Sequence, residues 1–298
     1  MTDAKANREL WFLERRPGKK GLMTEAYSKL TALSYAQRIE LPDERVAVCG
    51  DWHGDGAWVS ILARALPTLA PDITTILQLG DWWMNPAATD EAFAGTAIDR
   101  IYVVVGNHEN FGEVTPLLEA EPGAAVQVSS TTWLLPRPGR LIIGGRTVLC
   151  LGGATSVDKA WRREGINWWP DEDITDEHVR AAIAFGDADL MLTHETPART
   201  PVRAVQEILR TNPMGFPDDA LAESRLSRNR VAKVWDLVFP ELLVHGHMHV
   251  AGGGQTDDGR RVASLGQNNQ QGNLGFLDME TLTMKAPSLR EIREAAGM

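Results

Sequence analysis

One segment of the chain reads Ile101-Tyr102-Val103-Val104-Val105-Gly106-Asn107-His108-Glu109. Its first five residues are β-branched or aromatic, which is typical of a buried β-strand. The apolar pattern stops at a glycine, and the next three side chains carry an amide, an imidazole and a carboxylate. Such groups bind metal ions or transfer protons. The segment therefore predicts a buried strand with reactive side chains at its carboxyl end.

Four other apolar runs end in the same way, at residues 46–49, 73–79, 190–192 and 242–244. They continue as Gly50-Asp51-Trp52-His53-Gly54, Gly80-Asp81, Thr193-His194-Glu195 and His245-Gly246-His247-Met248-His249. Because open α/β sheets hold ligands just beyond the carboxyl ends of their strands, we expect the five ends to converge. Residues two apart in an extended chain point to the same side, so Asp51 with His53, and His247 with His249, should share a site. The glycines should let the backbone bend sharply there.

The rest of the chain alternates short strand patterns with longer helical ones, which is typical of an α/β domain. Further strands are expected at 141–143 and 147–151, and helices at 56–69, 87–99, 176–185, 201–211 and 219–238. Residues 272–284 read as two strands with a turn at 278–281, and 288–297 as a terminal helix. We divide the chain into an N-terminal helical extension (1–44), a main domain (45–286) and a C-terminal tail (287–298).

The composition is that of an ordinary globular protein, with 298 residues, 43% hydrophobic and 23% charged. A net charge of -10 argues against broad binding of nucleic acid, although bound cations could attract a phosphate locally. No apolar run reaches about 18 residues, so we expect no membrane span and a cytoplasmic protein. Two cysteines, Cys49 and Cys150, are too few for a disulfide framework and should be buried thiols.

The ordered set Asp-x-His, Gly-Asp, Gly-Asn-His-Glu, His and Gly-His-x-His, spread over residues 50–249, resembles the calcineurin-like metallophosphoesterase superfamily. The resemblance implies a four-layer αββα sandwich, in which two mixed sheets lie face to face and helices cover the outside. Two departures stand out. Trp82-Trp83-Met84-Asn85 does not match the longer second block of the phosphoprotein phosphatases, and Glu109 stands where many members carry Asp.

The resemblance also implies two divalent metal ions. Asp51, His53 and His249 would hold the first ion, Asn107, His194 and His247 the second, and Asp81 would bridge them. Nitrogen and oxygen ligands without thiolate suit Mn, Fe, Zn, Co or Ni, and manganese is our first expectation. A water shared by two such ions would lose a proton near neutral pH, and the hydroxide would attack phosphorus.

His108 matches the family histidine that stabilises the transition state or protonates the leaving oxygen. The alternative is a group beside the metals with no catalytic role. Glu109 could orient the His108 imidazole and raise its pKa, or it could be a solvated carboxylate. We expect His245 to pack or hydrogen-bond behind the ligands rather than to bind metal.

On the substrate side, Lys159, Arg162 and Arg163 follow a Gly-rich loop and could clamp a phosphate, or they could form a solvated charged face. The tryptophans near the motifs should wall the cleft and pack the loops, with stacking of a nucleobase as the alternative. We expect a phosphoesterase acting on a small phosphate mono- or diester. The alternatives are a nuclease or nucleotide phosphodiesterase, and a non-catalytic metal-binding scaffold. The complete ligand set favours an enzyme, and no oligomeric state is indicated.

Overall fold

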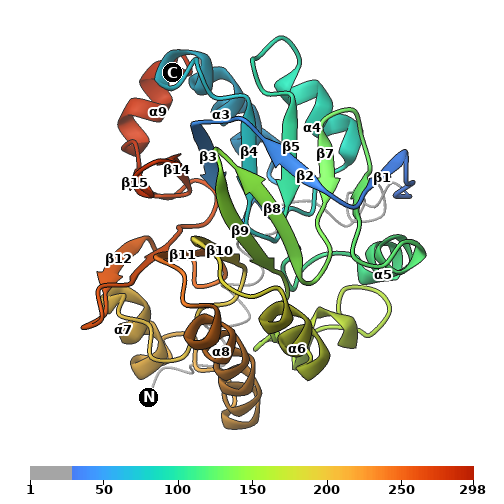
Figure 1. The fold of residues 1–298 in the computed structure, drawn as a ribbon, viewed down its shortest axis with the longest axis vertical. Coiled ribbons are helices and arrows are strands. Elements are labelled where there is room, and N and C mark those ends of the chain that lie inside the picture. The colour runs from blue at the N-terminus through green and yellow to red at the C-terminus, as the bar shows by residue number, and fades with distance from the viewer. Residues whose placement is uncertain (1–28) are drawn as a thin grey trace, which may run out of the picture.

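Two mixed β-sheets stack face to face in the computed structural model, which describes residues 29–298 (Figure 1). The first sheet has the order β1-β6-β7-β5-β4-β3-β14-β15, and the second has the order β12-β13-β11-β10-β9-β8-β2. Parallel strands form the centre of each sheet: β3, β4, β5 and β7 in the first, and β9, β10, β11 and β13 in the second. The carboxyl ends of the parallel strands in each sheet therefore lie along one edge.

The strands of the first sheet are β1 (Ser34–Ala36), β3 (Arg45–Cys49), β4 (Thr75–Gln78), β5 (Arg100–Val103), β6 (Ala125–Gln127), β7 (Thr132–Leu134), β14 (Leu274–Asp278) and β15 (Thr283–Lys285). Those of the second are β2 (Ile39–Leu41), β8 (Gly139–Ile143), β9 (Arg146–Leu151), β10 (Leu190–Thr193), β11 (Leu242–His245), β12 (Gly252–Gln255) and β13 (Arg261–Ser264). The helices are α3 (Gly56–Leu69), α4 (Pro86–Phe93), α5 (Phe111–Ala120), α6 (Asp176–Ala184), α7 (Arg203–Thr211), α8 (Asp218–Val238) and α9 (Leu289–Ala295), with two 3-10 turns, η1 (Lys159–Trp161) and η2 (Pro170–Glu172).

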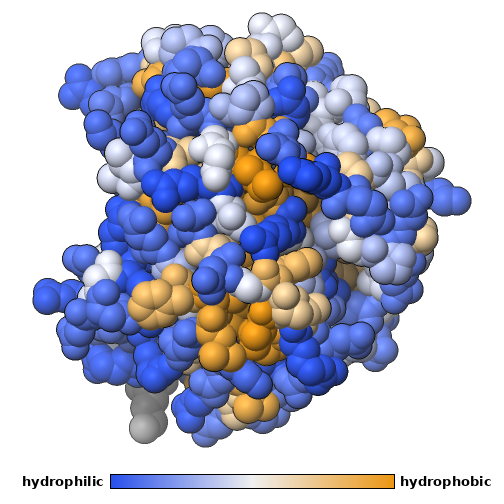
Figure 2. Space-filling view, viewed as in Figure 1, coloured by the Kyte–Doolittle hydropathy of each residue, from blue (hydrophilic) through white to orange (hydrophobic). Residues whose placement is uncertain are grey.

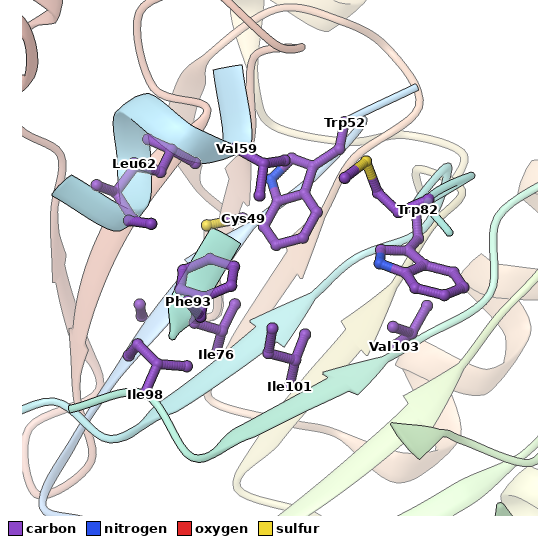
Figure 3. Close-up of a cluster of buried hydrophobic side chains, with 14 of the residues drawn as sticks. Cys49, Trp52, Val59, Leu62, Ile76, Trp82, Phe93, Ile98, Ile101 and Val103 are labelled. Carbon is purple, nitrogen blue, oxygen red and sulfur yellow. The ribbon is translucent and has the colours of Figure 1, made fainter. Parts of the chain in front are cut away.

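Strand β3 shows why the layers stack, because its side chains alternate between two cores. Val46 and Val48 point into the core between the two sheets. Ala47 and Cys49 face a second core, in which helices α3, α4, α5 and α9 cover the first sheet. Figure 3 shows Cys49 in this core together with Leu62 of α3 and Phe93 of α4. A third core packs α6, α7 and α8 against the outer face of the second sheet. Three apolar cores between four layers confirm the expected αββα sandwich.

The surface agrees with the charged composition. Hydrophilic residues cover most of the face shown in Figure 2, and apolar residues reach it in limited central areas. Both cysteines are buried free thiols, as expected. None of the helices described between residues 29 and 298 has the length and apolarity that crossing a bilayer would require.

The expected N-terminal helix is wrong where the structure describes it. Most of that segment, residues 1–28, lies outside the described residues. Within 29–44 the chain forms the short strands β1 and β2, which pair with β6 and β8. Each has three residues, so the pairing partner rather than a long sequence pattern makes them strands. The division of the chain at residues 44 and 286 stays a prediction.

Candidate metal centre

The ends of β3, β4, β5, β10 and β11 meet at one edge of the sandwich. Contacts between the two sheets hold them there. The Leu79 carbonyl after β4 lies 2.7 Å from Nδ1 of His194 after β10. The backbone N–H of His247 after β11 donates to Oδ1 of Asp51 after β3 at 3.0 Å. The seven side chains that the sequence suggested as metal ligands therefore lie around a common site.

One group of these side chains consists of Asp51, His53, Asp81 and His249. One donor atom of each lies within 4.8 Å of the donor atoms of the others. His53 Nε2 is 3.3 Å from Asp81 Oδ2, and His249 Nε2 is 3.5 Å from Asp51 Oδ1. Two imidazoles and two carboxylates at these distances form a set that could hold a divalent cation.

A second group lies on the other side of Asp81. His194 Nε2 is 2.9 Å from Asn107 Oδ1 and 3.3 Å from Asp81 Oδ1. The ring of His247 lies 5.0 Å from that of His194, measured between centroids. Asp81 thus turns Oδ1 toward His194 and Oδ2 toward His53, so one carboxylate faces both groups.

The hydrogen bonds around His194 test whether a cation fits. Its Nδ1 donates to the Leu79 carbonyl, so Nε2 of the neutral ring carries a lone pair. Asn107 donates from Nδ2 to Ser156 Oγ at 2.8 Å, and this bond turns its Oδ1 toward His194. Nε2 of His194 therefore faces two oxygen acceptors, on Asn107 and Asp81. Burial opposes a charge on this ring, but Asp81 and Asp51 raise its pKa, so without metal a proton on Nε2 serves these acceptors, and a metal ion would take the place of that proton. A metal ion satisfies such a convergence of acceptors.

The charge distribution also suits a cation. Burial opposes the charge on Asp81, but the neighbouring His194, His108 and His53 outweigh it and hold its pKa well below the usual range. Burial acts against the charged form of His53 too, yet contact with Asp81 raises its pKa to about 9. Burial and the nearby His194 hold the pKa of His247 well below its ordinary value. An ionised carboxylate therefore stands at the middle of the site at neutral pH.

The backbone at the ligands corrects one expectation. We expected extended chain at Asp51 and His53 and at His247 and His249. These four residues instead have φ of 49°, 49°, 64° and 55°, and Asp81 has 53°. Left-handed conformations cost non-glycine residues about 1–3 kcal/mol each and cluster at functional sites. The paired ligands face a common site because of this tight winding, not because of a strand period.

The role expected for the glycines is also corrected. Among Gly50, Gly80, Gly106 and Gly246, only Gly80 has a positive φ, of +89°. At Gly106 an added Cβ would lie 2.3 Å from Asp81 Oδ1, and at Gly246 it would lie 2.6 Å from an oxygen of Asp51. The latter two glycines leave room for ligand carboxylates rather than bending the chain.

His108 lies at the opening of the site. Its Nε2 is 4.0 Å from Asp81 Oδ2, its side chain is 20% exposed, and its backbone N–H donates to Asp81 Oδ1 at 2.9 Å. Nη2 of Arg162 lies 2.7 Å from the same Nε2. Burial holds the pKa of His108 well below its ordinary value, with Asp81 opposing and Arg162 adding to the shift. The imidazole is therefore close to the acidic centre and reachable from outside.

Glu109 does not contact the His108 ring through any hydrogen bond or ion pair seen in residues 29–298, contrary to expectation. Its carboxylate accepts from the backbone N–H groups of Gly106 at 2.9 Å and of Trp82 and Trp83 at 3.3 Å. Burial raises its pKa to about 7. Glu109 thus ties the loop after β5 to the loop after β4, and the expected rise in the pKa of His108 is wrong.

The three basic residues expected to bind substrate lie in different places. Arg162 reaches the centre, where its Nη2 contacts His108 and, at 2.7 Å, Oδ2 of Asp158. Lys159 instead forms an ion pair with Glu223. Arg163 is exposed, and its backbone N–H donates to Asn167. Only Arg162 is positioned to meet a group bound at the site.

The remaining residues near the motifs pack as expected. Trp52 and Trp82 are buried in the helix-side core (Figure 3), while the Trp83 ring lies 6.2 Å from the His108 ring. His245 is buried and lies within hydrogen-bond distance of Thr196 Oγ1 and the Gly246 carbonyl oxygen, at 3.1 and 2.9 Å.

Two contacts to the ligands were missed from the sequence. Ser156 accepts from Asn107, and Asn268 lies 3.1 Å from His53 Nδ1. Asn268 follows β13, in which Ser264 interrupts the apolar pattern before Leu265-Gly266. A glycine followed by polar residues was therefore present here too, but the apolar run before it was weaker than at the other five strand ends.

Comparison with known proteins finds one matching family and several solved structures of low sequence identity. The sequence profile of the calcineurin-like phosphoesterase family matches residues 44–251. Curated protein sequences gave no match. Similar solved structures include TT1561 of Thermus thermophilus, at 13% identity over 83% of this chain and 99% of that chain, with a TM-score of 0.49. A dimetal phosphatase from Danio rerio has 10% identity over 83% and 97%, with a TM-score of 0.49. The phosphopantetheinyl hydrolase PptH from Mycobacterium tuberculosis has 13% identity over 78% and 95%, with a TM-score of 0.47.

Proposed function

The chain belongs to the calcineurin-like phosphoesterase family, and on this premise we propose that it hydrolyses phosphate esters with two divalent metal ions. The position of Asp81 carries the proposal. It is fully buried, turns one oxygen toward His194 and the other toward His53, and is surrounded by nitrogen and oxygen ligands on both sides. Two-metal hydrolases share a carboxylate between ions about 3.5–4 Å apart.

Asp51, His53 and His249 would hold one ion, Asn107, His194 and His247 would hold the other, and Asp81 would be shared. Manganese is the first choice, with Fe, Zn, Co and Ni as alternatives for this donor set. When bound, the ions supply positive charge for the phosphoryl oxygens and activate water for attack on phosphorus.

The chain's own residues supply the rest of the chemistry. Arg162 is the cation that can meet a phosphoryl oxygen, and Asp158 holds its guanidinium at the opening. His108 lies beside Arg162 and 4.0 Å from Asp81, where it can donate a hydrogen bond to the ester and a proton to the leaving oxygen. A bound phosphate dianion would favour the charged imidazole, because an opposite charge nearby raises a histidine pKa.

The substrate that fits best is a small phosphate ester. The net charge of -10 is unfavourable for a long polyanion, and of the three expected cations only Arg162 stands at the opening. Both monoesters and diesters offer the non-bridging oxygens that the ions and Arg162 would bind.

Metal reconstitution tests the proposal. Full-length protein would be stripped with a chelator, titrated with Mn²⁺ or the alternative ions, and assayed on chromogenic mono- and diesters, cyclic nucleotides, dinucleoside polyphosphates and DNA. We expect two equivalents of metal and hydrolysis that depends on both. Binding of a single equivalent would refute the shared role of Asp81. Full metal binding without hydrolysis of any ester would favour a non-catalytic scaffold.

A further inference from the structure

Asn268 makes three contacts with the segment that carries the first metal motif. Its backbone N–H donates to the Asp51 carbonyl at 3.0 Å. Its Oδ1 is 3.1 Å from His53 Nδ1, and its Nδ2 donates to Asp55 Oδ2 at 2.8 Å. A single residue from the loop after β13 therefore contacts the two metal-binding candidates of this segment and the carboxylate that follows them.

Asp55 fixes which way the Asn268 amide faces. Its Oδ1 accepts from the Trp58 N–H at 3.0 Å and caps helix α3, while its Oδ2 accepts from Asn268 and, at 2.7 Å, from Asn269. A carboxylate is an acceptor only. Turning the amide over would place the Asn268 oxygen against this carboxylate, so its Nδ2 faces Asp55 and its Oδ1 faces His53.

This orientation determines the tautomer of His53. An amide oxygen accepts only, so Nδ1 of His53 must carry the proton that it donates. Because Nδ1 keeps its proton, the nitrogen that gives up a proton when a metal ion binds is Nε2, which lies 3.3 Å from Asp81 Oδ2. That nitrogen belongs to the group of ligand atoms from Asp51, His53, Asp81 and His249. The hydrogen bonds from Asp55 through Asn268 to His53 therefore orient the Nε2 atom of His53 toward that group.

We propose that Asn268 is a positioning residue of the metal centre, which holds His53 as the Nδ1-protonated tautomer and is itself held by Asp55. The inference rests on the proposed function only in requiring that the centre binds metal. Partners that hold the second nitrogen of a metal-binding histidine contribute about 10- to 100-fold to metal affinity. The effect should be confined to the ion that His53 binds.

The test compares Mn²⁺ binding by chelator-treated full-length variants in titration calorimetry. Asn268→Ala should weaken one of two binding events by about 10- to 100-fold and leave the other near the wild-type value. The double variant Asp55→Asn with Asn268→Asp exchanges donor and acceptor between the two residues, and it should recover most of the affinity. Thermal unfolding without metal should change little in either variant, whereas the rise in Tm on adding Mn²⁺ should shrink in Asn268→Ala only.

Asn269 provides the matched control. It also donates to Asp55, is exposed, and makes no hydrogen bond to His53 among the described contacts. Its φ of 61° suits glycine, so Asn269→Gly should fold without strain and bind Mn²⁺ as the wild type does. Wild-type affinity in Asn268→Ala, or equal loss in both single variants, would overturn the inference. Two tight binding events without ester hydrolysis would sink the proposed function alone, and a wild type that binds no divalent ion would end both.

Discussion

Replacing Gly106 by alanine should damage the centre without changing a ligand. The added Cβ would lie 2.3 Å from Asp81 Oδ1, 2.4 Å from Asp81 N and 3.0 Å from His194 Cε1. To reach ordinary contact at 3.4 Å, that oxygen would have to move by about 1 Å. Metal–ligand distances tolerate only about 0.2 Å. The move would also weaken the bonds that Asp81 Oδ1 accepts from the N–H groups of Asn107 and His108, at 3.1 and 2.9 Å.

Two magnitudes follow from this geometry. Overpacking of this kind costs about 1–3 kcal/mol in the free energy of unfolding, or roughly 2–10 °C in Tm for a domain of this size. Changes behind a metal ligand cost about 10- to 100-fold in metal affinity, so displacing Asp81, the carboxylate that we propose both ions share, should cost more than about 100-fold. Calorimetric unfolding of the metal-free variant measures the first quantity, and Mn²⁺ titration measures the second.

Gly56→Ala is the control for this experiment. Gly56 begins helix α3, its φ is not positive, and an added Cβ would meet only Met84 Cε, at 4.0 Å. Alanine there should leave metal binding unchanged and stabilise the helix by up to about 1 kcal/mol. If Gly106→Ala matched the wild type in both Tm and Mn²⁺ affinity, the close approach of Asp81 to this backbone would be refuted.

Three further predictions concern single side chains. Asp81→Asn keeps an oxygen for the two backbone donors but loses the charge. The fold should therefore persist, while Mn²⁺ affinity measured by calorimetry falls by more than about 100-fold. Unchanged metal content would contradict the proposal that Asp81 is shared by two ions. His108→Ala should lower kcat by about 10²- to 10⁴-fold with metal content intact, and loss of metal would mean that its role is misassigned. Burial raises the pKa of Glu172 to about 8, whereas the same carboxyl in the unfolded chain loses its proton near pH 4.5. The folded state therefore binds one more proton between these pH values, and the free energy of unfolding falls as pH rises from about 4.5 to 8. Because glutamine does not titrate, the free energy of unfolding of Glu172→Gln, measured by chemical unfolding, should rise relative to that of the wild type from about pH 4.5 to 8. A difference between the two proteins that stays constant with pH would show that Glu172 does not have a raised pKa.

The sequence allowed the central strands to be predicted because their signal is local. Apolar runs of three to seven residues that stop at glycine or at a polar residue predicted β3, β4, β5, β10 and β11. Helix α3 was expected at 56–69, as found. The edge strands carry no such signal. Strand β12 reads Gly252-Gly253-Gly254-Gln255 and is a strand because it pairs with β13. Helix α4 ends at Phe93, before Gly95 with a φ of 76°, so the expected helix at 87–99 was too long.

The residues of the candidate site also fall into those that the sequence predicted and those that it did not. Ligand types at strand ends could be identified from the sequence, since each is adjacent to its strand. The partners of those ligands could not, because they come from distant loops. Asn268 lies 215 residues from His53 along the chain, and Arg162 lies 54 residues from His108. Glu109 was adjacent to His108 in sequence, yet its carboxylate turns toward backbone groups instead.

The two carboxylates that we propose as metal ligands connect these observations, because each also accepts a hydrogen bond from the backbone of another proposed ligand. Asp81 Oδ1 accepts from the N–H groups of Asn107 and His108, and Asp51 accepts from that of His247. Hydrogen bonds to charged groups contribute about 1.5–3 kcal/mol each, which is comparable to the cost of the left-handed conformations at the ligands. We therefore expect the proposed centre to keep its shape without metal. Since the three apolar cores do not depend on these residues, we expect metal removal to leave the sandwich folded, with protonated imidazoles in place of the metal beside Asp81.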